Sequence, residues 1–577
     1  MASPSEIVLG ITYGHGDSSA ALIVNHQLVA AVEEERFTRI KHCASFPTHA
    51  IAYCLKHAKI EAKDIGYIAV GQQPLNQLWY RMQLGLSHPQ ILSQYLMRRP
   101  KQPKLHQLLA DSGLGNATVI RVEHHLAHLM SARFLSNADS QAFMSFDGLG
   151  DFVSVAIGRT QGNQIEVLDR IRFPHSLGFY YTAMTQYLGF PHFGDEFKVM
   201  GLAPYGQPKY LAAMRECIRE TEPFGFKLNL EAFPILRHPL KFQIRNEQPE
   251  MAPFYNANFL TQIIGVAPRK QKDNLDRQHW DLARSIQQRF EEVANTLLHQ
   301  LHRRVETKNL ALSGGCSHNS VWVGKIPALT PFKNVVLAPA SHDAGIAVGA
   351  AIYAANRPIE AENGNWALLG PDENDYDLGI LHESLESRQA PSRTQLLQTI
   401  AESLANGQIV GLFHGRMEFG PRALGSRSIL CDPRASDAKD KLNARVKHRE
   451  AFRPFAASVL SQYQRDWFQQ SFESPYMEAV FDVKNSMKHR IPAVVHTDGT
   501  CRIQSVTKAL QPFYYDLIEA FRKKTSIPML LNTSFNDCEP IVCTPQDAIR
   551  CFQNCEMDLL VIGNHLITRA NALKKSA

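Results

Sequence analysis

The chain has 577 residues, of which 44% are hydrophobic and 20% charged, so it is long enough for several domains and is not disordered by composition. Its 61 basic and 55 acidic residues give a net charge of +6, a mild excess that suits small anions better than nucleic acid. The ten cysteines include no CxxC pair, no apolar run is long enough to span a membrane, and the start does not read as a secretory signal. We therefore expect a cytoplasmic protein without a zinc ribbon.

The chain begins with three short apolar runs separated by turns. The first turn is rich in small residues and contains Asp17, and the second, Asn25-His26, is short enough for a tight hairpin. This pattern predicts strands at 7–12, 20–24 and 28–32. A similar order returns with strands at 142–146, 153–157 and 165–168, a first turn at 147–151 and a second at 158–163.

Asp17 and Asp151 occupy matching places in these two patterns. The match predicts an internal duplication of a hairpin unit, and two unrelated hairpins are the alternative. Each copy would present a carboxylate and backbone amides at a turn, where a phosphate or a metal ion can be held.

His124 and His128 stand one helical turn apart in a segment predicted to be a helix, so both imidazoles can reach one cation. Asp147 follows an apolar strand, and Asp343 precedes an apolar small-residue helix. Two histidines with two carboxylates suit Fe(II), Mn(II) or Zn(II), and ligand softness does not choose among these ions. Ordinary surface or core histidines are the alternative.

A long helix is predicted over 281–305, because apolar residues recur there at helical spacing. The predicted strand 310–313 then runs into Gly314-Gly315, with Asn319 shortly after. Residues without side chains let a backbone approach a nucleotide closely, and Lys41 could supply a cation to its phosphates. A charged strand end is the equally plausible alternative for Lys41.

The segment 357–393 is polar and without periodicity, so we interpret it as a linker between two bodies. The second body is rich in arginine near its start, and guanidinium groups match the oxygens of phosphate. Asn532 and Ser534 follow an apolar strand and offer further donors to an anion. The basic residues that could converge on such a pocket are Arg416, Arg422, Arg427, Arg434, Lys447, Arg449 and Arg453.

Taken together, the segments 33–41, 124–128, 194–206, 415–430, 447–455 and 531–542 resemble the NodU/CmcH family of O-carbamoyltransferases, in the same order along nearly the whole chain. The resemblance implies an α/β protein with a duplicated actin-like domain of the ASKHA, Kae type at 1–358. A linker at 359–392 and a YrdC-like α+β domain at 393–577 would follow.

The resemblance also implies an activity. The YrdC-like domain would join carbamoyl phosphate to ATP, with Mg(II), release pyrophosphate and make carbamoyl adenylate. The actin-like domain, with an Fe(II)-type centre, would then pass the carbamoyl group to a hydroxyl of a small molecule. The partners are therefore these substrates rather than nucleic acid or a membrane, and the oligomeric state stays open, a homodimer included.

Roles carried over from the family motifs fall into four sets. His124, His128, Asp147 and Asp343 would hold the metal, and Lys41, Gly314, Gly315 and Asn319 the adenylate. Arg422, Lys447, Arg453, Asn532 and Ser534 would contact carbamoyl phosphate and ATP. His15 and Asp17 would be catalytic.

Two departures from the family pattern stand out. The family commonly has a histidine, a candidate general base, directly before the position of Asp17, whereas this chain has Gly16 there and His15 one residue earlier. The stretch before Glu539-Pro540 is one residue shorter than in many relatives, so we expect a small change of loop. The competing functions are an actin-like ATPase or kinase, a metal hydrolase, and a threonylcarbamoyl-type RNA-modifying enzyme.

Overall fold

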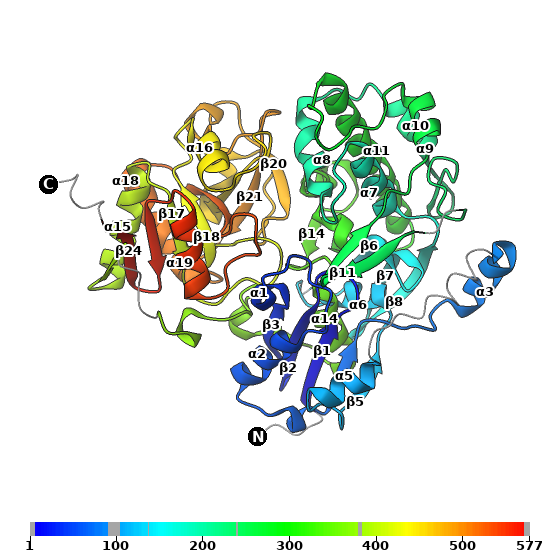
Figure 1. The fold of residues 1–577 in the computed structure, drawn as a ribbon, viewed down its shortest axis with the longest axis horizontal. Helices are drawn as coiled ribbons and strands as arrows, with labels where there is room; N and C mark the ends of the chain where they lie inside the picture. Colours follow the sequence, from blue (N-terminus) through cyan, green and yellow to red (C-terminus); the bar gives the residue numbers. More distant parts are fainter. Residues whose placement is uncertain (1–5, 90–103, 137, 238–239, 379–383, 571–577) are drawn as a thin grey trace. The chain divides into compact units, whose positions relative to one another are not determined.

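The structure is a computed structural model that describes residues 6–89, 104–136, 138–237, 240–378 and 384–570. The chain forms two compact units. Unit 1 consists of 1–35, 42–319 and 325–361, and unit 2 of 36–41, 320–324 and 362–577. Two short segments, 36–41 and 320–324, therefore belong to unit 2 although the chain on either side of each belongs to unit 1 (Figure 1). Within the described residues, no helix is both long and apolar enough to cross a bilayer.

The first sheet of unit 1 confirms the predicted N-terminal strands. Its order is β15-β3-β2-β1-β4-β5, with β1, β2 and β3 antiparallel and β4 and β5 parallel to β1. Asn25 and His26 both have positive φ, as a tight hairpin turn requires. The strands are β1 (Ile7–Thr12), β2 (Ser19–Val24), β3 (Gln27–Glu33), β4 (Tyr67–Val70), β5 (Thr118–Arg121) and β15 (Glu360–Ala361).

The second sheet repeats this topology, which confirms the predicted duplication. Its order is β14-β13-β6-β7-β8, with β6, β7 and β8 antiparallel and β13 and β14 parallel to β6. Unit 1 is thus an actin-like pair of sheets. The strands are β6 (Ala142–Gly150), β7 (Val153–Gln161), β8 (Gln164–Arg172), β13 (Asn309–Ser313) and β14 (Asn334–Leu337).

Two predicted turns of this second copy were wrong in extent. Strand β6 continues through 147–150 with a register shift against β7, so Asp147 lies in the strand rather than in a turn. The turn between β7 and β8 is only Gly162-Asn163, because cross-strand pairing extends to Gln161 and Gln164. Continued pairing of β7 with β6 and β8 overrides the local turn propensity of the glycine and asparagine residues in these segments.

Two helices of unit 1 pack against each other and connect its halves. α14 (Gly345–Ala355) also packs on β1 and β2, and α6 (His124–Ser131) packs on β6 and β7. A Cβ at Gly349 of α14 would lie 1.7 Å from the carbonyl oxygen of Ala127 of α6, so only glycine allows this approach. The close packing fixes the start of α14 relative to α6.

The predicted long helix is α11 (Arg277–His302), and its apolar stripe is fully buried as expected, by Leu282, Ile286, Phe290, Val293, Leu297, Leu298 and Leu301. Asp276 caps its N-terminus by accepting from the amides of Gln278 and His279. The other helices of unit 1 include α2 (Thr48–Ala58), α3 (Leu78–Ser87), α5 (Leu105–Asp111), α7 (Leu177–Tyr187), α8 (Glu196–Leu202), α9 (Leu211–Cys217) and α10 (Ala257–Ile264).

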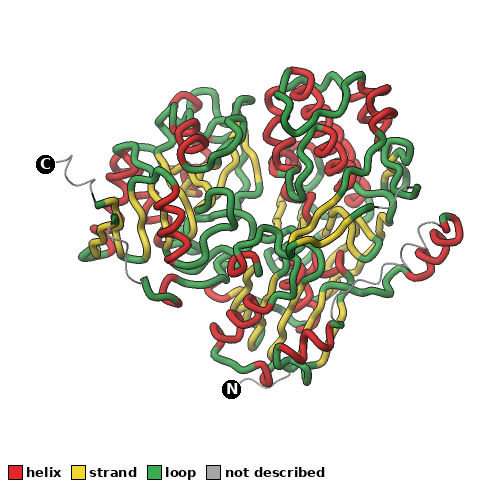
Figure 2. The backbone as a smooth tube through the Cα atoms, viewed as in Figure 1, coloured by secondary structure: helices red, strands yellow, loops and turns green. Residues whose placement is uncertain are grey.

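Unit 2 is built on one nine-stranded mixed sheet (Figure 2). Its order is β16-β24-β23-β17-β18-β22-β19-β21-β20, and only β17 with β23 and β19 with β21 pair in parallel. The strands are β16 (Leu385–Gln389), β17 (Val410–Phe413), β18 (Arg427–Cys431), β19 (Ala456–Leu460), β20 (Ala479–Asp482), β21 (Thr500–Val506), β22 (Met529–Ser534), β23 (Leu559–Ile562) and β24 (His565–Arg569).

The main helices of unit 2 are α15 (Arg393–Ala405), α16 (Ala438–Arg445), α18 (Pro512–Thr525) and α19 (Pro545–Asn554). Part of the segment expected as a linker is ordered here, since β16 pairs with β24 at the edge of the sheet. The N-terminal segment 36–41 joins this unit through Arg39, which donates to the carbonyl oxygens of Pro540 and Ile541 at 2.6 and 2.7 Å.

Candidate functional site

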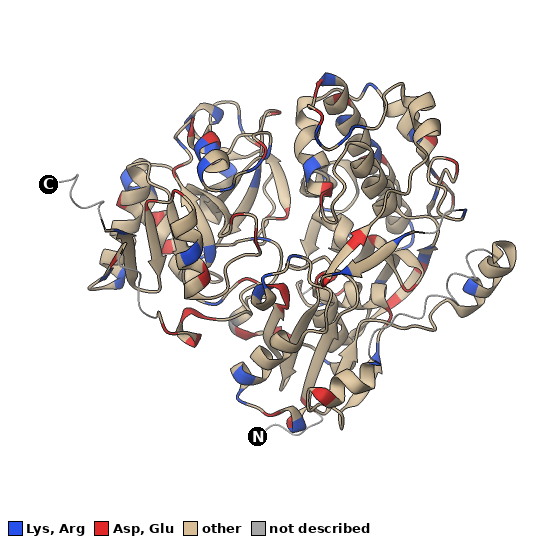
Figure 3. Ribbon diagram, in the orientation of Figure 1, with Lys and Arg blue, Asp and Glu red and all other residues tan. Residues whose placement is uncertain are grey.

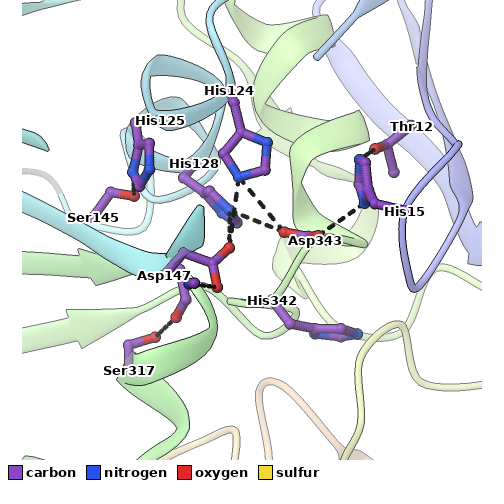
Figure 4. A network of polar contacts seen from close by, with 12 residues as sticks. Thr12, His15, His124, His125, His128, Ser145, Asp147, Ser317, His342 and Asp343 are labelled. Carbon is purple, nitrogen blue, oxygen red and sulfur yellow. Dashed lines mark hydrogen bonds and ion pairs between the residues drawn. The ribbon is translucent and has the colours of Figure 1, made fainter. Parts of the chain in front are cut away.

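The four predicted metal ligands of unit 1 come together at one point (Figure 4). His124 and His128 lie one turn apart on α6, Asp147 lies in β6, and Asp343 lies in the turn before α14. One ligand atom from each residue lies within 4.8 Å of the others. Both histidines are buried, and both carboxylates are half-buried. The packing of α6 against α14 and β6 therefore assembles residues that are far apart in the sequence.

Each imidazole faces both carboxylates. The Nε2 atom of His128 lies 3.2 Å from Oδ2 of Asp147 and 3.4 Å from Oδ1 of Asp343. The Nε2 atom of His124 lies 3.5 and 3.7 Å from the same two oxygens. Burial lowers the pKa of His128, but hydrogen bonds and charge from Asp147 and Asp343 more than reverse this effect and raise it to about 9.

The same cluster contains polar atoms that protein hydrogen bonds leave unsatisfied. Nε2 of His124 and Oδ1 of Asp343 are buried without a hydrogen-bond partner. Orphaned buried polar atoms are costly, and an imidazole nitrogen and a carboxylate oxygen that both offer lone pairs toward one point fit a bound cation. The donor set of two imidazoles and two carboxylates fits Fe(II), Mn(II) or Zn(II). The residues present therefore fit the expected metal.

His15 lies beside this cluster. Its Nδ1 lies 2.8 Å from Oδ2 of Asp343, and its Nε2 lies 3.0 Å from Oγ1 of Thr12. Burial lowers the pKa of His15, but Asp343 raises it above its usual range. His15 thus orients Asp343, one of the proposed metal ligands. Residues that hydrogen-bond to metal ligands commonly have this role.

Asp17 lies in the β1–β2 turn with φ of 63° and contacts the side chain of His42, which the sequence motifs did not single out. Its Oδ1 lies 2.8 Å from Nδ1 of His42, and Glu35 accepts from the backbone amide of His42 at 2.8 Å. Burial opposes ionisation of Asp17, yet the charges of His42 and His342 hold its pKa below the usual range. His42 directly follows Lys41 in the charged segment 33–42, the one sequence signal that pointed to it.

The structure explains the unusual Gly16. A Cβ at Gly16 would lie 2.8 Å from Cε1 of Phe193, and the Phe193 ring packs edge-on against His42 at 5.4 Å between centroids. A histidine at position 16 would therefore collide with the ring that contacts His42.

Gly314 and Gly315 lie beside the proposed metal ligand Asp147 and its strand β6. Gly314 has φ of 85°, and a Cβ there would lie 2.3 Å from the carbonyl oxygen of Phe146. A Cβ at Gly315 would lie 2.9 Å from Oδ1 of Asp147. Asn319 exchanges two hydrogen bonds of 2.9 Å with Gln287 of α11. The glycines thus allow β13 to end close to Asp147, and Asn319 is held by the core helix.

Unit 2 gathers a second, cationic cluster. Burial lowers the pKa of Arg422 to about 10, and burial followed by the charge of Arg453 lowers that of Arg449 to about 9. Burial and the charges of Arg422, Arg449 and Arg453 lower the pKa of Arg502 well below its usual range. Arg502 therefore lies in one weakly hydrated region with Arg422, Arg449 and Arg453, and an anion would stabilise these cations.

Lys447 lies at the edge of this cluster and is buried. Its Nζ donates to the carbonyl oxygen and Oδ1 of Asn536, both at 2.8 Å, and to the carbonyl oxygen of Ser534 at 2.5 Å. Burial and the charge of Arg449 lower its pKa well below the usual range, and Lys41 adds to this effect. The structure therefore places Lys41 with Lys447 in unit 2, whereas Gly314, Gly315 and Asn319 lie in unit 1.

Asn532 and Ser534 lie in β22, near its end. The amide nitrogen of Asn532 donates to the carbonyl oxygen of Ala423 at 3.1 Å, and its buried Oδ1 has no hydrogen-bond partner. Ser534 donates to Oδ1 of Asn536 at 2.7 Å. The hydroxyl of Ser534 thus holds the turn that follows β22, whereas the amide nitrogen of Asn532 is held by Ala423.

Three of the arginines that we expected to converge have other partners. Arg416 pairs with Glu362 at 2.5 Å, and Arg434 pairs with Asp432 at 2.6 Å. Arg427 is buried in β18, donates to the carbonyl oxygens of Gly415 and Pro371, and lies 3.5 Å over the ring of Phe413. Arg416 and Arg434 thus have carboxylate partners, and backbone carbonyl oxygens hold the terminal nitrogens of Arg427.

Arg502 was not found from the sequence at all, and Arg449 was noted only as part of the run. Arg502 lies in β21, fifty residues beyond the arginine-rich segment, and the parallel pairing of β21 with β19 brings it back. Its isolated position in the sequence carried no signal.

Sequence models of one family match both halves of the chain. The carbamoyltransferase N-terminus matches residues 7–352, and the carbamoyltransferase C-terminus matches residues 401–569. The chain therefore belongs to the carbamoyltransferase family, and the predicted family is confirmed.

Curated relatives agree with this assignment. Protein sll1178 of Synechocystis sp. is 36% identical over 97% of this chain and 96% of its own length. The nodulation protein NolNO of Sinorhizobium fredii is 34% identical over 97% of this chain and 80% of its own length. The nodulation protein NolO of Bradyrhizobium diazoefficiens is 34% identical over 78% of this chain and 79% of its own length.

Proposed function

We propose that this protein is an ATP-dependent O-carbamoyltransferase that makes carbamoyl adenylate from carbamoyl phosphate and ATP and transfers the carbamoyl group to a hydroxyl of a small natural product or sugar. Carbamoyl transfer follows from the family. The use of ATP, the adenylate and the kind of acceptor are the proposal. Because both substrates are metabolites of the cytoplasm, the proposal places the reaction there.

The observation that supports it best is the cationic cluster of unit 2. The charges of Arg422, Arg449 and Arg453 add to the effect of burial in lowering the pKa of Arg502, so these guanidinium groups lie near one another. Nε of Arg422 and Nε of Arg502 are buried without a hydrogen-bond partner. Phosphate oxygens would supply both the negative charge and the acceptors that these guanidinium groups lack.

The proposed first step balances only if water takes part. Water displaces phosphate from carbamoyl phosphate and leaves carbamate. A carbamate oxygen then forms a bond to the α-phosphorus of ATP, and pyrophosphate leaves. The products are carbamoyl adenylate, phosphate and pyrophosphate in equal amounts. The adenylate keeps a good leaving group, and its AMP part offers many contacts that can supply binding energy.

In the second step, the acceptor oxygen attacks the carbamoyl carbon, AMP leaves, and the hydroxyl loses its proton. His124, His128, Asp147 and Asp343 would hold an Fe(II), Mn(II) or Zn(II) ion, which as a Lewis acid would polarise the carbamoyl carbonyl. His15 would orient Asp343. The imidazole of His42, held at Nδ1 by Asp17, would take the hydroxyl proton, as an oriented histidine does in general base catalysis.

One assay separates this function from its competitors. The purified protein is incubated with ATP and carbamoyl phosphate, and pyrophosphate, ADP and AMP are measured. Formation of pyrophosphate and phosphate in equal amounts supports the proposal. Release of ADP would indicate a kinase or ATPase, and products independent of ATP would indicate a hydrolase. A panel of hydroxylated metabolites with radiolabelled carbamoyl phosphate would then identify the acceptor, and inclusion of RNA tests the RNA-modifying alternative.

A further inference from the structure

We infer that the exposed face of α3 is a contact surface for a second copy of this chain. The surface consists of five large apolar side chains, which we call the α3 stripe: Leu75, Leu78, Trp79, Met82 and Leu86. Their exposed fractions run from 48% for Leu78 and Met82 to 79% for Trp79 and Leu86. The other large hydrophobic side chains exposed in the described residues are Val119, Phe197 and Leu329, which lie on separate elements.

The opposite face of this region is attached to unit 1. Arg172 of β8 donates to Oε1 of Gln77 at 2.7 Å, and the hydroxyl of Tyr80 donates to the carbonyl oxygen of Phe173. The guanidinium of Arg81 lies 4.1 Å from the centroid of the Phe152 ring. Because these contacts hold one face, the stripe points away from the sheets, and α3 extends outward from them (Figure 1).

The low charge of α3 limits the classes of partner that could bind its exposed face. Its sequence, LWYRMQLGLS, contains one charged residue, Arg81, which is on the attached face, and most of the helix is neither acidic nor basic (Figure 3). A nucleic acid or an acidic peptide would gain no electrostatic energy here. Helices that lie on membranes usually carry several basic residues on the polar face, whereas the one basic residue of α3, Arg81, contacts Phe152 on the attached face. A second stripe of the same kind is also uncharged and apolar, so pairing two copies buries no lone charge.

The spacing and the area also fit self-association. Leu75, Trp79, Met82 and Leu86 recur at intervals of four, three and four, the spacing of a seam that packs against another helix, and Leu78 lies beside this seam. Trp and Met are among the side chains most enriched at protein interfaces. From the exposed fractions, each copy would bury on the order of 600 Å², and a symmetric pair on the order of 1,200 Å², which reaches the lower range of stable interfaces.

The test is sedimentation velocity of the full chain over about 1 to 100 μM, without substrates. We expect a dimer that dissociates on dilution. The double variant Trp79→Gln and Leu86→Gln removes the two most exposed residues of the stripe but none of the attaching contacts. It should weaken the dimer at least about 100-fold, since truncation of a tryptophan anchor costs roughly 2 kcal/mol or more and Trp79 is lost from both copies. Leu329→Gln, at an isolated side chain that is 49% exposed, is the matched control and should leave the dimer unchanged.

Three results would overturn the inference: a wild-type protein that stays monomeric over the whole range, a double variant that still dimerises, or a control that dissociates equally. Flotation with vesicles of neutral phospholipid adds a direct comparison. If the wild-type protein binds vesicles as a monomer and the double variant does not, the occupant is a membrane and the inference is wrong. Because no step uses ATP or carbamoyl phosphate, these outcomes are independent of the proposed enzymatic activity.

Discussion

Asp17 and Asp151 occupy equivalent turns of the two duplicated sheets, each two residues before the second strand, with φ of 63° and 50°. Their partners differ. Oδ1 of Asp17 holds Nδ1 of His42, whereas Oδ2 of Asp151 accepts from the backbone amides of Gln73 and His124, each at 2.9 Å. One copy of the turn therefore orients a titratable side chain, and the other holds the first residue of α6, which carries the proposed metal ligands.

Replacing His128 by alanine should separate the two half-reactions. Loss of one buried imidazole leaves three proposed ligands, so the bound metal and carbamoyl transfer should each fall by at least about 100-fold. Pyrophosphate release, which depends on unit 2, should persist. Metal content by mass spectrometry and the two product assays measure this. His299→Ala, at an exposed histidine near the end of α11, is the control. Equal loss of both half-reactions in a folded protein would contradict the division of labour.

Replacing Arg502 by glutamine should have opposite effects on stability and affinity. The substitution removes one charge from a buried group of like charges, so the thermal midpoint without substrates should rise or stay level. The KM for carbamoyl phosphate should increase by about 10- to 100-fold, because a charge-assisted hydrogen bond is worth roughly 1.5–3 kcal/mol. Arg434→Gln, whose guanidinium pairs with Asp432, should not change KM. An unchanged KM for Arg502→Gln would remove this residue from the proposed site.

Gly194→Ala tests the position of His42. Gly194 has φ of 84°, and an added Cβ would lie 2.7 Å from Nε2 of His42. Gly265→Ala is a matched control, because Gly265 has φ of 78° with no atom within 4 Å of such a Cβ. Both variants should lose about 1 kcal/mol of stability from left-handed backbone strain. Only Gly194→Ala should lower kcat for carbamoyl transfer. If kcat falls equally in both, displacement of His42 is not the cause.

Glu478 should make stability depend on pH. Burial raises its pKa from 4.5 to about 7. Between these values the unfolded chain releases the proton while the folded protein keeps it, so the free energy of unfolding falls as pH rises through this window. The loss should be on the order of 3 kcal/mol and complete by about pH 8. Comparing urea midpoints at about pH 5 and about pH 8 measures it, and Glu478→Gln should abolish this part of the dependence. An identical pH dependence in the variant would assign it to other groups.

Much of the fold was predictable because local patterns decide it. The strands of the first hairpin, the helix α11 and its seven buried apolar residues follow directly from alternation and helical spacing. The extent of β6 and of the β7–β8 turn was not predictable, since both depend on pairing with neighbouring strands. The same holds for Arg427, whose burial in β18 follows from cross-strand packing and not from its neighbours in sequence.

By itself, the sequence determined the family, the duplication and the four residues His124, His128, Asp147 and Asp343, because residue type and short-range spacing encode them. Only the tertiary structure decided which groups meet. It removed Arg416, Arg427 and Arg434 from the expected cationic cluster, added Arg502, and paired Asp17 with His42. The physical reason is that charge and hydrogen bonding act over a few ångströms in space, whereas these partners, apart from Asp432 and Arg434, lie tens of residues apart along the chain.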